Sequence, residues 1–137
     1  MKQLAENELT KEELINVFKS AYMKVEDQDD KSFRVKCEDL GVRVSIDKER
    51  KHLRLSILYV LNKRMPLSTA EHIVNEINKD FIFIRFSVFE LEEKTYINSD
   101  YYISFEEGLI PFHVVHMTKR LEKFTVEALR ESFDSYL

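Results

Sequence analysis

Glycine is almost missing from this chain of 137 residues, with Gly41 and Gly108 as its only two. Phosphate-binding loops and the nucleophile elbow of α/β-hydrolases each need two or more glycines within a few positions, because the backbone must bend closely around a ligand or a nucleophile. The two glycines here lie 67 positions apart. The sequence therefore excludes the dinucleotide-binding motif, the P-loop and the nucleophile elbow.

Cysteine occurs only once, at Cys37, so an intrachain disulfide and a paired-cysteine metal site are both excluded. A redox role would need an exposed thiol with a lowered pKa. We expect Cys37 instead to lie on the inward side of a strand, where a buried thiol behaves as a small hydrophobic side chain.

The chain also lacks a concentration of positive charge. Its 21 basic and 25 acidic residues give a net charge of −4. Residues 1–30 hold four basic and eight acidic residues, and the rest of the chain is electrically neutral. Nonspecific binding to nucleic acid needs a basic surface that attracts phosphates. The sequence thus disfavours a nucleic-acid partner.

Long apolar runs are missing as well, and no segment is long enough to predict a membrane span. The first ten residues contain acidic side chains and no apolar stretch, which is not typical of a signal peptide. We therefore expect a cytoplasmic protein with no membrane partner.

What the sequence does contain is a period of two. Apolar and polar residues alternate in five runs, at 33–37, 42–46, 53–61, 82–88 and 97–105. Such alternation predicts antiparallel strands with one buried and one solvated face. We expect the following residues to be among the most buried: Val44, Leu55, Ile57, Phe86 and Ile103.

Three helices are predicted around these strands. Thr10 with Glu13, and Ser68 with Glu71, have the spacing of capping boxes at helix starts. The first helix carries an apolar stripe that reaches Val25, after which the acidic run 26–30 is interpreted as a solvated loop. A long amphipathic helix follows Pro111, because proline is tolerated in the first helical turn.

These elements predict a single α+β domain over residues 1–137 in the order α-β-β-β-α-β-β-α. Its fold would be one five-stranded antiparallel sheet with the helices packed on one face, since that arrangement buries every apolar stripe.

Two histidines, His113 and His116, stand three positions apart at the start of the last helix. This spacing could supply two metal ligands, but a catalytic zinc site needs three protein ligands and no third one stands at motif spacing. We therefore expect no metal and no cofactor, and we interpret the pair as partly exposed imidazoles beside apolar neighbours.

The outward side of the predicted sheet is the candidate binding surface. Aromatic and apolar residues gather there, and an apolar patch on a small domain usually marks an interface. The candidate partner-binding residues are Leu58, Val60, Phe83, Phe89, Tyr96 and Tyr102. We expect a homodimer built on this surface, unless the C-terminal helix or residues 1–9 cover it.

The segment AEHIVNEINKDFIFIRFSV, followed by YYISFEEGLIPFHVVHMTKRLEKF, resembles the YbjN family of bacterial proteins. The shared pattern is a short helix ending in N-x-I-N, two strands, and a glycine before a long amphipathic helix, and it covers about residues 32–132. The resemblance implies a fold like that of the type III secretion chaperones and a non-enzymatic, dimeric protein that binds other proteins or takes part in regulation. It carries over no site residues.

Three functions remain open at this point. The favoured one is a non-enzymatic protein-binding or chaperone-like module that acts as a homodimer. The second is a regulator that holds a small ligand, which would require a concave pocket with convergent polar groups. The third is a hydrolase with a site assembled in space around His113 and His116, which would require a perturbed histidine in a pocket.

Overall fold

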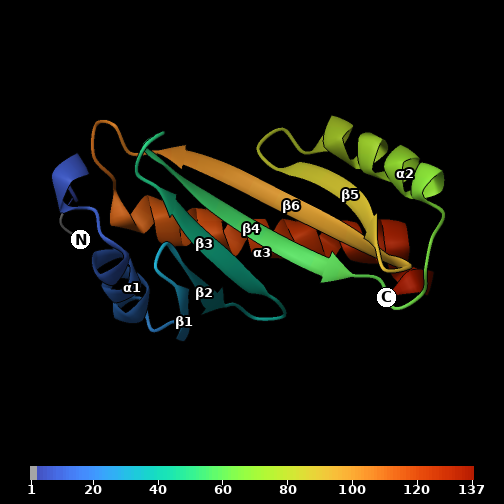
Figure 1. Ribbon diagram of the computed structural model, residues 1–137, viewed down its shortest axis with the longest axis horizontal. Coiled ribbons are helices and arrows are strands. Elements are labelled where there is room, and N and C mark those ends of the chain that lie inside the picture. Colours follow the sequence, from blue (N-terminus) through green and yellow to red (C-terminus); the bar gives the residue numbers. More distant parts are fainter. Residues whose placement is uncertain (1–2) are drawn as a thin grey trace.

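The structure is a computed structural model that describes residues 3–137. Three α-helices accompany a long twisted sheet, and Figure 1 shows their arrangement. The elements, in chain order, are η1 (Glu6–Glu8), α1 (Lys11–Ser20), β1 (Val25–Asp29), β2 (Ser32–Lys36), β3 (Gly41–Asp47), β4 (His52–Val60), α2 (Leu67–Asp80), β5 (Arg85–Leu91), β6 (Lys94–Ser104), α3 (Pro111–Phe133) and η2 (Asp134–Tyr136).

All neighbouring strands are antiparallel, in the order β1-β2-β3-β4-β6-β5. The last strand, β6, lies between β4 and β5, so the second half of the chain completes the sheet begun by the first. The α+β class and the single antiparallel sheet are confirmed. The strand count is corrected from five to six.

The additional strand is β1, which contains the acidic run that was predicted to be a loop. Val25, expected at the end of the first helix, instead pairs with Val35 of β2. An edge strand is bonded on one side only, and the other four residues of β1 are exposed, so polar side chains suit it and apolar alternation disappears. Ion pairs accompany it, from Lys11 to Asp27 at 2.7 Å and from Lys36 to Glu26 at 3.2 Å.

The helix starts agree with the sequence in two cases out of three. The Thr10 hydroxyl accepts a hydrogen bond from the Glu13 N–H at 3.1 Å and caps α1, and Pro111 occupies the first turn of α3. The cap predicted at Ser68 is wrong, because α2 already begins at Leu67 with Pro66 before it and no side-chain cap. The residues of this first turn, 67–69, are exposed, so water can satisfy their N–H groups without a capping hydroxyl.

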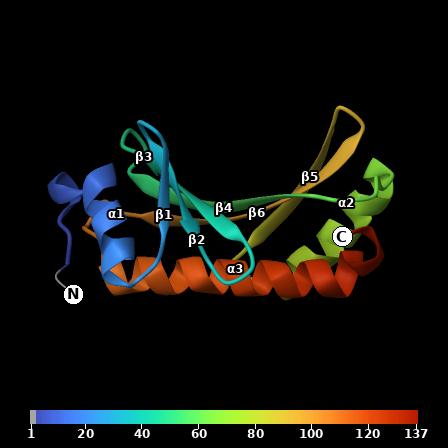
Figure 2. The ribbon, with the colours of Figure 1, turned by 90° about the horizontal axis from the view of Figure 1, so that it is seen from below.

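The core lies between the sheet and α3, which runs beneath the length of one sheet face (Figure 2). Leu53, Leu55 and Val44 from the sheet and Leu121 from α3 are fully buried. The five residues predicted to be most buried are at most 9% exposed, which confirms the predicted strand orientation. A one-residue slip would have turned the opposite set inward.

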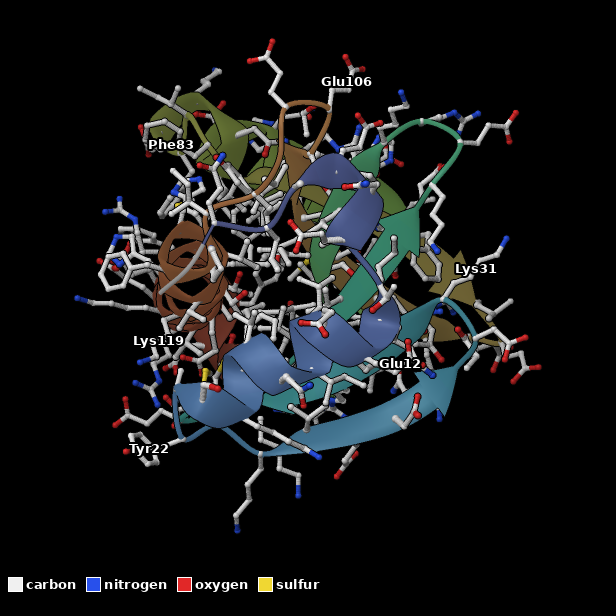
Figure 3. All side chains as sticks on the ribbon, turned by 90° about the vertical axis from the view of Figure 1, so that its left-hand side faces the viewer. Glu12, Tyr22, Lys31, Phe83, Glu106 and Lys119 are labelled. Carbon is white, nitrogen blue, oxygen red and sulfur yellow. The ribbon has the colours of Figure 1, made fainter. Side chains whose placement is uncertain are left out.

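The strand predicted from residue 82 begins later, at Arg85. Residues 81–84 connect α2 to β5, and Ile82, expected to be buried, is 89% exposed. Phe83 was expected on the outward side of the sheet, but Figure 3, which looks along α3, places it on the α3 side of the molecule. An unbroken apolar run does not indicate where its strand begins, because helix, loop and strand can all use such residues.

No helix or strand of residues 3–137 covers the face of the sheet opposite α3, which we call the open face (Figure 2). The sheet curves away from α3 toward both ends, so the open face is concave in that view. The possibility that the C-terminal helix covers this face is thereby removed, since α3 packs against the other one.

Candidate functional site

An apolar strip occupies one end of the open face. It consists of Leu58, Val60, Phe89, Leu91 and Tyr96. Leu58 is 57% exposed and Phe89 is 41% exposed, although both are large hydrophobic side chains. Four of these residues were predicted from the alternation, and Leu91 was missed.

Strand pairing brings the members of the apolar strip together. Tyr96 of β6 lies opposite Val60 of β4 on one side and opposite Phe89 of β5 on the other. The Phe89 and Tyr96 rings stack with their centroids 5.0 Å apart and their planes 5° from parallel. Stacked aromatic pairs hold each other in place, so the strip is a preformed surface.

Two of the predicted interface residues lie outside this strip. Phe83 is 63% exposed but belongs to the connection before β5, beside Ile82. Tyr102 is on the open face but farther along β6, where its ring packs edge-on against His52 at 5.0 Å. The Arg85 guanidinium lies 5.8 Å from the centre of the Tyr102 ring, so this aromatic side chain sits in a cationic environment.

A buried carboxylate lies near the middle of the open face. Asp100 is 1% exposed, although its position in β6 points away from the core. It accepts hydrogen bonds from Arg54 at 3.1 and 3.3 Å and from Arg85 at 3.1 and 3.2 Å. The hydrogen bond to Asp100, followed by the charge of Asp100, raises the pKa of Arg85, so this arginine is always charged. Asn98 can accept from Arg54 at 3.2 Å while donating to the Ile57 carbonyl at 3.3 Å.

Basic side chains line a depression beside this carboxylate, which we call the arginine depression. Its volume is about 540 Å³. Its polar lining includes Gln28, Arg34, Arg43, Arg54, Ser56, Ser87 and Asn98, and Leu58 and Phe89 of the apolar strip border it. Local sequence patterns do not reveal this depression, because its residues come from strands that are distant in the sequence.

The two histidines do not form a site with other groups in the part of the chain that the structure describes. His113 and His116 are exposed at the start of α3, and the His116 ring stacks over Phe112 at 6.2 Å. Neither imidazole has a hydrogen-bond or ion-pair partner among residues 3–137. No group of three or more His, Cys, Asp or Glu side chains in that range is arranged to hold a metal ion.

Cys37 borders a wide groove of about 1200 Å³ between the end of β2 and α3. Burial, and next the charge of Glu122, raise the pKa of the Cys37 thiol to about 12. Glu122 is itself buried and accepts hydrogen bonds from the Asp39 and Leu40 N–H groups at 2.8 and 2.9 Å. The Glu122 carboxylate thereby fixes the turn between β2 and β3 to α3, which is a structural role.

Comparisons with known proteins agree with this fold. No family model and no curated protein sequence matches the chain. Among solved structures, the crystal structure of YbjN from E. coli, described as "a putative transcription regulator", matches with a TM-score of 0.78. The match covers 96% of each chain at 8% sequence identity.

The chain has the fold of YbjN. The predicted resemblance is thus confirmed at the level of architecture, and at 8% identity the likeness concerns the fold alone.

None of the helices formed by residues 3–137 has the length and apolar character needed to span a membrane.

Proposed function

We propose that this protein is a non-enzymatic protein-binding module that acts as a homodimer through its apolar strip. The observation that carries the proposal is the exposure of this strip on a sheet face that the chain itself leaves uncovered. Burying one large hydrophobic side chain contributes about 1.5–3 kcal/mol, so a strip of five is a substantial driving force for association.

A second copy is the simplest partner for the strip. Two-fold symmetry places the same patch of each subunit against its counterpart, which is the commonest arrangement in small oligomers. The arginines elsewhere on the open face favour a contact centred on the strip, because a two-fold axis through the arginine depression would oppose like charges. The dimer would then involve β5, β6 and the end of β4.

A regulatory role is compatible with such a module. The description of YbjN as "a putative transcription regulator" concerns that protein. For this chain, we infer that a regulatory role would be exerted by binding another protein, since the fold offers an exposed face for such a partner.

Sedimentation equilibrium at micromolar concentration tests the dimer. The wild-type protein should have about twice the chain mass of 16.4 kDa. Phe89→Glu should shift it toward the monomer, because a charge buried in an apolar contact is strongly unfavourable. Tyr22→Glu is the matched control, since Tyr22 is 98% exposed in the turn before β1.

Far-UV circular dichroism of both variants should match the wild type, because neither substituted side chain belongs to the buried core. A wild-type protein that stays monomeric over the accessible concentrations would contradict the homodimer. A dimer that Phe89→Glu leaves intact would show that another surface forms it.

A further inference from the structure

The arginine depression is the strongest concentration of charge on the open face. A row of directly paired residues crosses the sheet there: Arg34, Arg43, Ser56, Asp100 and Arg85, with Arg54 beside it. On the other side of Arg34 the row continues to Glu26 of β1, which forms an ion pair with Lys36 at 3.2 Å, so Asp100 and Glu26 are its two carboxylates. Of the four arginines, only Arg54 and Arg85 bind Asp100, so the cluster has excess positive charge in a chain whose net charge is −4.

The arginines differ in how far they are already neutralised. Arg54 and Arg85 share Asp100, and Arg43 lies 3.3 Å from Asp29 at the rim. Arg34 has no ion-pair partner among residues 3–137. Its exposed guanidinium is therefore available to an incoming anion.

Gly41 shapes the surface around Arg34. A Cβ atom at position 41 would coincide with the Arg34 side chain, so the missing side chain of Gly41 provides the space in which Arg34 lies. One of only two glycines in the chain thus accommodates this arginine on the open face.

The pairing of Arg34 with Arg43 is unfavourable for the isolated protein. The two residues stand directly opposite each other on β2 and β3, and like charges in this position destabilise a sheet. An anion bound between them would remove the repulsion and form charge-assisted hydrogen bonds with both guanidinium groups.

We propose that the arginine depression binds an acidic segment of a partner protein, whose carboxylates pair with Arg34 and Arg43. Leu58 and Phe89 border the depression, so an apolar residue next to the acidic ones would contact the side of these two side chains that faces the depression. The inference rests on the proposed protein-binding role of the open face, and it does not depend on the homodimer.

Charge complementarity favours a peptide over nucleic acid. A phosphate backbone needs cationic side chains over an extended track. Here the arginines are confined to one depression, and the acidic strand β1, with Glu26 and Asp29, lies at its rim. A polyphosphate chain would meet these carboxylates, whereas a short acidic peptide can end before them.

Fluorescence anisotropy provides the test, with a short dye-labelled peptide that carries a run of glutamates followed by leucines. The wild-type protein should bind the peptide, and added salt should weaken the binding because the contact is ionic. Arg34→Gln should weaken it about tenfold, the effect of losing one charge-assisted hydrogen bond. Lys119→Gln removes the same charge from α3, on the opposite side of the molecule from the open face, and should leave the affinity unchanged (Figure 3).

A structural role for Arg34 predicts a different result. If Arg34 only supported the sheet, Arg34→Gln would lower the midpoint of thermal unfolding. The proposal requires a midpoint close to that of the wild type, because Arg34→Gln removes the repulsion with Arg43 together with the attraction to Glu26, which lies opposite Arg34 on β1. A lowered midpoint would therefore overturn it.

Three further outcomes would also overturn the inference. These are no binding by the wild type, equal weakening by Lys119→Gln, and tighter binding of a single-stranded DNA oligonucleotide of the same charge. If the protein is a dimer and does not bind the peptide, only this inference is contradicted. A monomer that binds the peptide would support it and contradict only the homodimer.

Discussion

Asp100 shows why a residue's place in an alternating pattern does not determine its burial. Its position in β6 points to the open face, as the pattern predicts, yet it is 1% exposed. Arg54 and Arg85 lie over it and supply four hydrogen bonds. A buried carboxylate is tolerated when its oxygens are paired in this way. The open face therefore contains a buried polar centre as well as exposed side chains.

Cys37 provides a prediction at the same scale. Its pKa of about 12 means that the thiol stays protonated at neutral pH, and only the thiolate reacts with alkylating agents. Native protein should react with iodoacetamide much more slowly at pH 8 than protein unfolded in guanidinium chloride. Mass spectrometry of the alkylated fraction over time measures both rates. Equal rates would contradict a half-buried thiol that stays protonated.

The same shift also affects stability at high pH. Because the folded-state pKa of Cys37 lies above the usual thiol value of 9.0, the folded protein retains a proton that the unfolded chain releases. The contribution of Cys37 to the free energy of unfolding is complete below about pH 9 and is lost as the pH rises toward 12.

At the scale of elements, the two edge strands are protected in different ways. β1 carries acidic side chains and an irregularity in its pairing between Asp27 and Asp29, both of which discourage further strand pairing. β5 is protected by α2: the Asn78 side chain accepts from the Phe86 N–H at 2.8 Å and donates to the Phe86 carbonyl at 2.9 Å. The edge groups of Phe86 are thus already satisfied within the chain.

Replacing Asn78 with alanine tests this arrangement. Asn78→Ala leaves both backbone groups of Phe86 without their partner, so we expect the free energy of unfolding to fall by about 1–3 kcal/mol. Denaturant titration followed by circular dichroism measures the change. Asn75→Ala, on the exposed side of the same helix, is the control and should be nearly neutral. A similar loss in both variants would attribute the effect to helix α2 in general.

At the scale of the whole molecule, the one-sided covering of the sheet is the dominant feature. All three helices leave the same face open, and that face combines an apolar strip with the arginine depression (Figure 2). Apolar area with a charged border is typical of a protein–protein interface, where the apolar centre drives binding and the charges select the partner.

Association has a consequence for thermal stability. A dimer couples folding to binding, so the unfolding midpoint should increase by about 5 °C when the protein concentration is raised about a hundredfold. Differential scanning calorimetry over that range measures the shift. Phe89→Glu should abolish the concentration dependence, and a wild-type midpoint that does not change with concentration would contradict a dimer.

Local patterns in the sequence were sufficient to predict the strands and helices that have one buried face. Leu55 and Ile57 face the core as predicted, because the side-chain period of a strand is a property of the backbone itself. Thr10 caps α1 for a similarly local reason, since donor and acceptor lie three residues apart. The apolar strip could be found in the same way, because four of its members are outward positions of predicted strands.

Only the tertiary structure decided which strands lie side by side. β1 was missed because an edge strand buries little and needs no apolar alternation. The cluster of Arg54, Arg85 and Asp100 exists because β6 pairs with β4 and β5 at one register, which joins side chains that are 46 and 15 positions apart. Period and capping are local interactions, whereas strand order is set by packing of the whole chain, so the sequence determined the strip and the fold created the arginine depression.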